Sequence, residues 1–481
     1  MEVLRKYENL LDKIKGWYLV VFATFLLLSR MVCFVELVSN RLNGLCYLLG
    51  AAAGGILCVA ELLLHYKRYM KKEYYLLAFF VLVCLISSFL FRDYGLGDNV
   101  KTLMWTVLQL FLFTSILPYG DKKNEGSVES GKIALCRMAN SLIVVHFVAV
   151  TISVVQFFLQ SSYIVADYNG TYDRRQGFYD ERLFGVFTDP NYAAIASLLV
   201  IIFALYFLQK QEEKKIMRDW YIITIVMNML YILLSGSRTA MVATSVVLPV
   251  YGYFIWRNVR LKEGKKWHLS GTLLSVGVLV VSVLYFVFSS TVFIAVADKT
   301  VELRPYIGLC PYEEQQEISL EREDTGDDIS NNRTAIWSGA LSLWKDHPVT
   351  GLSPKNMIPY ALKNHPDSYI AKTGYQAHNG YVALLVGSGL LGVLPILLLL
   401  VLFVRELLIF LKENRGREME AGLLLCFAVM MTVGISAVFL LEIFFTVTIT
   451  ITSVLFWIFT GAAYWYLRAA NGKKLEMGKE Y

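Results

Sequence analysis

Residues 380–403 read GYVALLVGSGLLGVLPILLLLVLF, and this stretch decides the fold class. It contains no charged side chain. A helix needs roughly 20 predominantly apolar residues to cross the hydrocarbon core of a bilayer. Helices are the default spanning structure, because a membrane β-barrel would show short segments of alternating hydrophobicity instead. The stretch therefore predicts a transmembrane helix.

The composition places the whole chain in the membrane class. Of its 481 residues, 56% are hydrophobic and 17% are charged, and the mean hydropathy is +0.51. A soluble domain carries about 25% charged residues. The net charge of +6 does not indicate nucleic-acid binding, because the basic residues fall in short loops between apolar runs. The seven cysteines show neither a disulfide framework nor a CxxC metal spacing.

We predict an all-α integral membrane protein with about twelve transmembrane helices. Basic residues cluster in alternate loops, for example at residues 67–72 and 257–266. Since cytoplasmic loops carry an excess of Lys and Arg, both termini are expected in the cytoplasm. The predicted spans are residues 17–38, 43–64, 74–91, 100–117, 136–159, 190–208, 220–235, 239–256, 269–290, 380–403, 420–441 and 444–467.

This count divides the chain into three regions. Residues 1–289 hold nine spans, residues 290–379 form a large extracytoplasmic loop, and residues 380–481 hold three more spans and a cytoplasmic tail. Loops longer than about 15 residues are usually functional or disordered. A second outer segment, residues 160–189, is also long.

The large loop is expected to contain short amphipathic helices. RTAIWSGALSLW, residues 333–344, has apolar residues at helical spacing, so it should form a helix that lies on the bilayer surface or against the bundle. Residues 356–364 can form a further short helix. The acidic stretch 313–328 lacks the alternating ligand spacing of a Ca²⁺ loop, which favours solvated surface charge.

Three arginines and one histidine lie where apolar runs meet the predicted outer face: Arg182, Arg238, Arg333 and His378. Ionisable side chains near lipid are costly to keep, which makes these four candidates for a functional site. Arg238 follows Gly236, a suitable helix C-cap, in a very short hairpin. Each residue also has an ordinary explanation, namely a snorkelling arginine, a lipid headgroup contact, a loop charge or a structural histidine.

These residues suit the transfer of a sugar from a polyprenyl pyrophosphate. The departing pyrophosphate gains negative charge, and the planar fork of an arginine matches two of its oxygens. The acceptor hydroxyl must lose a proton, and a neutral His378 is a suitable base, since nearby arginines disfavour its protonated form. No HExxH, P-loop or GxSxG motif appears. Hydrolase and nucleotide-sugar chemistry therefore have little support, and no metal or other cofactor is expected.

Four motifs follow one another over residues 182–392. They are RLFGVFTDPN from Arg182, LSGSRTA around Arg238, RTAIW from Arg333 with PVTG after it, and HNGYVALLVGSGLLG from His378. With this order, and with the large loop before the last motif, the chain resembles the O-antigen ligases and Wzy-type polysaccharide polymerases of bacterial inner membranes.

The resemblance implies a metal-independent, inverting glycosyltransferase of the membrane GT-C type. By that likeness, Arg182 and Arg238 would hold undecaprenyl pyrophosphate, and His378 would engage the acceptor hydroxyl. One departure is Val386, because related sequences often carry an acidic residue there, and this puts the role of that acid in doubt here. The further substrate contacts implied are Arg333, Asn191, Arg174, Arg175 and Asn379.

The resemblance allows three acceptors: a growing glycan, a lipid A core or a protein. Polymerisation of a surface polysaccharide from an undecaprenyl-pyrophosphate-linked oligosaccharide, at the outer face of the cytoplasmic membrane, is expected as the commonest type. Its partners would be the acceptor glycan, membrane lipids, and a flippase and a chain-length regulator, with no nucleic acid.

Two other classes compete with this interpretation. A flippase or another transporter predicts inverted repeats and charged residues near the bilayer midplane. No repeat appears, and Arg30, Arg137 and His146 are the obvious deep polar residues. A membrane receptor or scaffold would leave the arginines unexplained.

Overall fold

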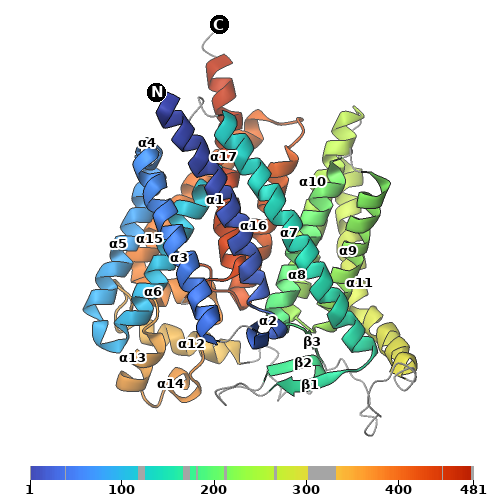
Figure 1. The fold of residues 1–481 in the computed structure, drawn as a ribbon, viewed down its shortest axis with the longest axis horizontal. Helices are drawn as coiled ribbons and strands as arrows, with labels where there is room; N and C mark the ends of the chain where they lie inside the picture. The colour runs from blue at the N-terminus through green and yellow to red at the C-terminus, as the bar shows by residue number, and fades with distance from the viewer. Residues whose placement is uncertain are drawn as a thin grey trace.

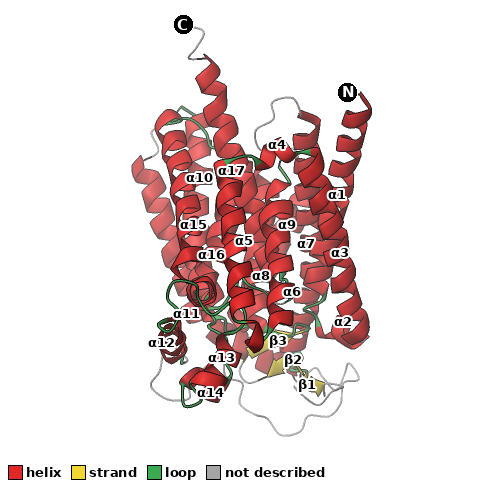
Figure 2. Ribbon diagram, turned by 90° about the vertical axis from the view of Figure 1, so that its left-hand side faces the viewer, coloured by secondary structure: helices red, strands yellow, loops and turns green. Residues whose placement is uncertain are grey.

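The computed structural model describes residues 2–37, 40–117, 125–165, 174–179, 182–210, 214–264, 268–301, 332–446 and 448–477. Long helices run side by side, and the start of α1 and the end of α17 lie at one end of this bundle (Figure 1). The opposite end carries a small sheet and short helices (Figure 2). We call these two ends the terminal end and the loop end. Cys310 and the acidic stretch 313–328 fall outside the described residues.

Eleven long helices build the described bundle. They are α1 (Glu2–Leu28), α3 (Asn40–Leu64), α5 (Lys72–Leu90), α7 (Glu125–Phe158), α8 (Pro190–Gln209), α9 (Lys215–Leu234), α10 (Arg238–Lys262), α11 (His268–Val301), α15 (Gly380–Glu413), α16 (Ala421–Phe439) and α17 (Ile451–Met477). The shorter helices are α2 (Val32–Leu37), α4 (Tyr66–Tyr69), α6 (Leu96–Val107), α12 (Arg333–Trp344), α13 (Met357–Asn364) and α14 (Tyr369–Thr373).

The predicted α-helical membrane architecture is confirmed. Among the described residues, nine helices are long and apolar enough to cross a membrane, so the count of twelve spans is not confirmed. The predicted span 100–117 is not one regular helix, because α6 passes into a π-helical turn and then a 3-10 turn that ends at Ser115. The predicted span 17–38 is likewise divided between α1 and α2.

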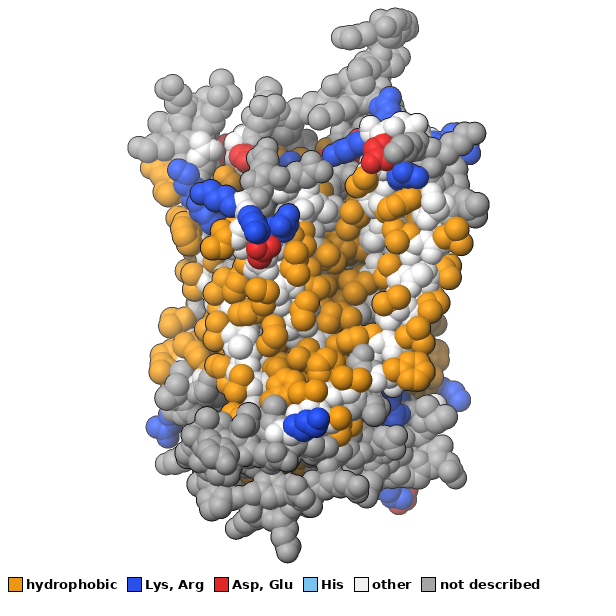
Figure 3. Space-filling view, turned by 90° about the vertical axis from the view of Figure 1, so that its right-hand side faces the viewer, with side chains coloured by type: hydrophobic (Ala, Val, Ile, Leu, Met, Phe, Trp, Pro, Cys, Tyr) orange, Lys and Arg blue, Asp and Glu red, His pale blue; other side chains and the backbone are white. Residues whose placement is uncertain are grey.

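The outer surface of the bundle is apolar. A band of hydrophobic side chains covers one face of the molecule, and Lys and Arg lie above and below it (Figure 3). Leu63 in α3 and Val281 in α11 are 73% and 66% exposed. Apolar surface of this extent is not tolerated in water but is expected where lipid covers it.

Residues 160–189 contain a sheet that the all-α prediction did not include. β1 (Ser162–Val165), β2 (Arg174–Tyr179) and β3 (Arg182–Gly185) form an antiparallel sheet in the order β1-β2-β3. β3 packs against α7 and α8, so the sheet sits on the loop end of the bundle. The strands are four to six residues long, too short for a clear alternating pattern in the sequence.

Residues 332–379, which carry α12, α13 and α14, form what we call the cap. The cap has its own core, centred on Ile336, Leu343, Leu352, Tyr360 and Ile370, and α12 packs against α15. Of the two predicted positions for the amphipathic helix, the structure therefore shows the one against the bundle. The predicted short helix at 356–364 is α13.

The cap is hydrogen-bonded into a break in α15. Gly389 has a left-handed φ of 60° with an extended ψ of −170°, which interrupts the helix. The amides of Leu390 and Leu391 donate instead to the carbonyls of Pro348 and Val349, at 2.9 and 3.1 Å. Residues 380–403 are thus a broken helix rather than the single one predicted, because a segment of the cap supplies part of its hydrogen bonding.

A glycine-to-alanine change should test this junction. Gly351 has φ +67°, and a Cβ there would lie 2.5 Å from the backbone nitrogen of Gly389. We expect Gly351→Ala to destabilise the protein by at least about 2 kcal/mol, since left-handed strain alone costs roughly 1–2 kcal/mol. Gly374→Ala is the matched control, because Gly374 has φ +65° with open space around it. Equal thermal unfolding temperatures for the two variants in detergent would contradict this packing.

Candidate active site

The four residues selected from the sequence all lie at the loop end. Arg182 begins β3, Arg238 begins α10, Arg333 begins α12, and His378 lies two residues before α15. The starts of α10 and α12 present free backbone N–H groups, which favour anions. The elements that carry these residues are far apart in the sequence but lie at the same end of the bundle (Figure 1).

Arg182 braces the turn that leads into α10. Its side chain is buried, with Nε donating to the carbonyl of Ser235 and a terminal nitrogen donating to Oδ1 of Asn191, both at 2.8 Å. Gly236, with φ +62°, follows the end of α9 as predicted and lies against the Arg182 side chain. Arg182 and Arg238 are therefore linked through one short, hydrogen-bonded turn.

Asp189 and Asn191 connect this turn to α8. Asp189 is the N-cap of α8, with Pro190 as the first helical residue, as the sequence predicts. The carboxylate of Asp189 accepts a hydrogen bond of 2.7 Å from the backbone amide of Asn191. The side chain of Asn191, a predicted substrate contact, already accepts a hydrogen bond from Arg182.

His378 is held in an unusual backbone conformation. Its φ of 45° is left-handed, which is uncommon for a residue other than glycine and often marks a functional site. Its ring is half buried, with the ring of Tyr375 at 6.2 Å. Asn379, another predicted substrate contact, is the N-cap of α15 and accepts from the amides of Tyr381 and Val382.

The surroundings of His378 favour the neutral form of its imidazole. Burial is the largest cause that lowers the pKa of His378, and the positive charge of Arg333 lowers it further. The negative charges of Glu442 and Asp189 oppose this shift of the pKa. The structure thus supports the predicted influence of Arg333 on the pKa of His378. It also shows that burial, which the sequence did not predict, lowers this pKa more than Arg333 does.

Arg174 and Arg175 lie further out, on β2. The guanidinium of Arg175 packs 4.8 Å from the ring centre of Tyr179 and 5.9 Å from that of Phe184. β2 is the middle strand of the sheet and pairs with β3, the strand that begins at Arg182. These two arginines therefore border the site from the sheet.

Sequence reasoning missed Glu442 and Lys355. Glu442 lies between α16 and α17, and its carboxylate forms an ion pair with Nζ of Lys355 in the cap. A signal was present, since Glu442 is the sole charged residue between positions 421 and 467. A lone acid in an apolar run is a candidate for function.

Residues 222–397 match the family model described as O-Antigen ligase (Wzy_C). The chain carries an O-antigen ligase domain. The matched segment includes Arg238, Arg333 and His378, whereas Arg182 precedes it and Glu442 follows it. No curated protein sequence matches the chain. The match supports, in general terms, a membrane enzyme of surface polysaccharide assembly or ligation, and the family implies lipid-linked oligosaccharide and acceptor glycan as classes of substrate.

A long apolar groove is lined in part by residues of the O-antigen ligase domain. It has a volume of about 520 Å³ and lies between α5, α15, α16 and α17. Tyr381 and Phe444 line it near the loop end, and Phe403 and Tyr464 line it towards the terminal end. Leu397 and Leu400 also line the groove and are about half exposed, so it opens sideways onto the bundle surface.

The terminal end of the groove is closed by polar side chains. The carboxylate of Glu73 accepts hydrogen bonds from Tyr464 Oη and from Arg468, both at 2.5 Å. Arg468 also forms an ion pair with Glu406 at 3.4 Å. The groove therefore extends from Tyr381, three residues after His378, to Glu73 and Tyr464 at the terminal end.

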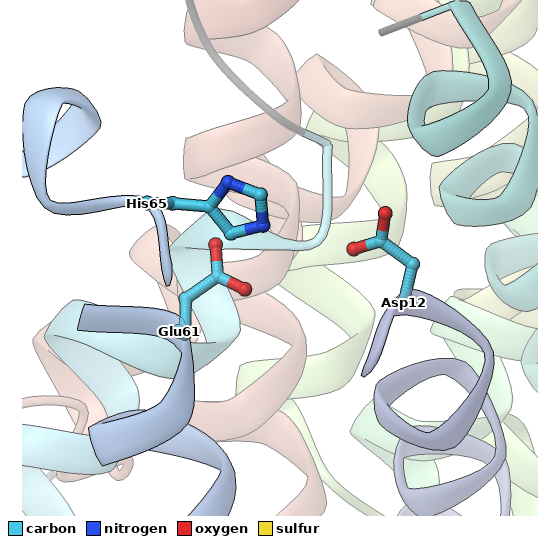
Figure 4. A group of neighbouring side chains, drawn as sticks. All are labelled: Asp12, Glu61 and His65. Atoms are coloured by element: carbon cyan, nitrogen blue, oxygen red, sulfur yellow. The ribbon is translucent and has the colours of Figure 1, made fainter. Parts of the chain in front are cut away.

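A second cluster of ionisable groups lies at the terminal end, away from the candidate site at the loop end. Asp12, Glu61 and His65 are buried and point toward one another, with ligand atoms within 4.8 Å (Figure 4). Lys15 pairs with Glu61 at 3.0 Å and with Asp12 at 3.5 Å, and Arg68 pairs with Glu61. Two cations therefore balance two carboxylates, and an added divalent metal would leave an uncompensated buried charge.

This cluster is expected to hold the terminal end of α1 against α3. We expect Glu61→Gln to destabilise the protein by about 3–5 kcal/mol, because the buried charge of Arg68 would lose its carboxylate and Lys15 would keep only its longer pair with Asp12. Asp98→Asn is the matched control. It breaks an exposed ion pair with Lys101 and should cost less than about 1 kcal/mol. A similar loss of thermal stability in both variants would contradict the structural role of Glu61.

Proposed function

We propose that this protein polymerises a surface polysaccharide. It transfers a glycan from an undecaprenyl-pyrophosphate donor to the hydroxyl of an acceptor glycan at the outer face of the bacterial cytoplasmic membrane. The observation that supports this most is the apolar groove, which opens onto the bundle surface and reaches Tyr381, three residues after His378. A lipid-linked substrate needs both an apolar path for its tail and a charged site for its head.

In this proposal, each candidate residue at the loop end has its own role in the transfer. Arg238 and Arg333, each at the start of a helix, bind the pyrophosphate and stabilise its charge as it leaves. Arg182 holds the turn that places Arg238. The acceptor oxygen attacks the anomeric carbon, the bond from that carbon to the pyrophosphate oxygen breaks, and the lipid pyrophosphate departs with the bonding electrons. His378 takes the proton of the acceptor hydroxyl, and attack opposite the leaving group inverts the anomeric configuration.

The isoprenoid tail lies in the groove during the reaction. The groove is lined by Leu384, Leu397 and Phe403, and these apolar side chains suit a hydrocarbon chain, since burial of apolar surface stabilises binding by about 25 cal/mol per Å². The side opening allows the tail to enter directly from the bilayer. In this proposal the flippase and the chain-length regulator act before and after the transfer.

A transporter is the alternative from another class, and the chain shares one feature with that class. Discontinuous helices are typical of transporter binding sites, and α15 is broken at Gly389. The amides freed by this break are bonded by Pro348 and Val349 of the cap. The break therefore serves attachment of the cap rather than ion coordination, which favours the enzyme.

Reconstitution with defined lipid-linked donors tests the proposed function. The purified protein in liposomes should convert a lipid-linked single repeat unit into a ladder of longer glycans, with release of undecaprenyl pyrophosphate. Transfer only to a lipid A core or to a protein acceptor would identify a ligase. Movement of the intact substrate between leaflets without any new glycosidic bond would identify a transporter and overturn the proposal.

A further inference from the structure

The turn between α16 and α17 presents one charged residue to the loop end. Within residues 440–446, Leu441, Ile443, Phe444 and Phe445 are buried, and Glu442 is the one ionisable residue. Two side-chain donors clamp the turn. Nε1 of Trp457 donates to the carbonyl of Ile443 at 2.9 Å, and Oγ1 of Thr106 donates to the carbonyl of Phe444 at 3.1 Å. Glu442 is thus fixed in place by its neighbours.

This turn touches the start of α15, immediately after His378. A Cβ on Gly380 would lie 2.6 Å from the carbonyl oxygen of Leu441 and 3.5 Å from Ile443. The rings of Tyr381 and Phe444 are 6.4 Å apart. The residues on both sides of Glu442 therefore pack against the helix that His378 precedes.

Three charged groups influence the pKa of His378, each from a different element. Arg333 belongs to α12, Asp189 caps α8, and Glu442 comes from the turn. The ring of Tyr375 packs beside the imidazole. Glu442 in turn forms its ion pair with Lys355, and the side chains of both are largely buried, at 18% and 9% exposure. The electrostatic balance at His378 therefore depends on the pairing of Glu442.

We propose that Glu442 is a positioning residue for glycosyl transfer, which stabilises the imidazolium of His378 while Lys355 limits the strength of that effect. This role rests on the proposed function. When His378 takes the acceptor proton, a positive charge forms in a half-buried place beside Arg333. A fixed carboxylate offsets that charge, as the acid of a nucleophile–base–acid triad does. The proton itself stays on His378 until it passes to water.

Two substitutions should shift the pH at which His378 titrates in opposite directions. Glu442→Gln removes a negative charge, so His378 should titrate at lower pH than in the parent, and maximal turnover should fall on the order of tenfold, the equivalent of one pKa unit. Lys355→Met removes the competing positive charge, so His378 should titrate at higher pH. Glu442→Asp keeps the charge and should retain most of the activity.

The experiment combines two readouts on the full-length protein in detergent. The pH dependence of glycan transfer is measured for the parent, the three variants and His378→Ala. The rate at which diethyl pyrocarbonate modifies His378 is followed by mass spectrometry across the same pH range, because this reagent attacks the neutral imidazole. Thermal unfolding checks that each variant is folded.

The outcomes separate the two hypotheses. Opposite shifts in the Glu442→Gln and Lys355→Met titrations support the role of Glu442. If His378→Ala is inactive but folded Glu442→Gln titrates and turns over like the parent, the role of Glu442 is overturned while the proposed function stands. If His378→Ala keeps the activity of the parent, His378 is not the base and the role of Glu442 is overturned, while glycan transfer stands. If the parent itself transfers no glycan, the proposed function fails, and the role of Glu442 in transfer fails with it.

Discussion

Replacing His378 by Ala is expected to lower the rate of glycan transfer by about 10²- to 10⁴-fold, the usual contribution of a positioned base. The imidazole is half buried beside Arg333, in a left-handed backbone conformation that the cap and α15 hold in place. A methyl group cannot accept the proton of the acceptor hydroxyl. Lipid-linked single repeat units should therefore accumulate in cells while long polysaccharide disappears, as measured on glycans extracted at equal protein level.

The pH dependence of the parent provides a second check on His378. Burial and Arg333 lower its pKa below the ordinary value of 6.5. Because a base works in its neutral form, transfer should be constant near pH 7 and should fall only below pH 6.5. His365→Ala is the matched control, since His365 is also at the loop end but pairs with Asp346. Wild-type rates in His378→Ala would rule out general-base catalysis by this residue.

The second large effect is expected at Arg238. Loss of one preorganised electrostatic contact to a developing charge costs about 3 kcal/mol, or roughly 10²-fold in rate, and we expect Arg238→Ala to show this loss. Arg238→Lys should restore little, because an ammonium cannot engage two phosphate oxygens with a planar fork. Initial rates with a defined undecaprenyl-pyrophosphate donor provide the measurement.

The control for Arg238 is Arg92, an exposed arginine at the end of α5. Arg92→Lys should transfer glycan at the parental rate. If Arg238→Lys also behaves like the parent, a bidentate contact between Arg238 and the pyrophosphate is wrong, and simple attraction of charge is sufficient.

Hydropathy predicted most of the helices because lipid imposes a simple demand on composition. It failed where tertiary contacts replace regular hydrogen bonding. The break at Gly389 depends on Pro348 and Val349, which no local pattern places beside it. Similarly, the predicted short loop at 442–443 is part of a longer irregular segment, and this segment is stable because Trp457 and Thr106 bond its carbonyls.

The candidate site was predictable in part. Arg238, Arg333 and His378 stood out as charges at the ends of apolar runs, and each begins or precedes a helix in the structure. The roles of Asn191 and Asn379 were not predictable, because a short motif does not show that one side chain bonds to Arg182 and the other caps α15. Glu442 was missed because its closeness to His378 arises from the packing of α15 against the turn before α17.

The junction between the cap and α15 also constrains how substrates reach the enzyme. Two amides of a helix within the apolar bundle depend on carbonyls of the cap, so lifting the cap would leave those amides without partners in a medium that offers no water. The cap is therefore expected to stay attached to α15. Under the proposed function, glycans would enter and leave at the edge of the cap, and their lipid tails would enter through the side opening of the groove.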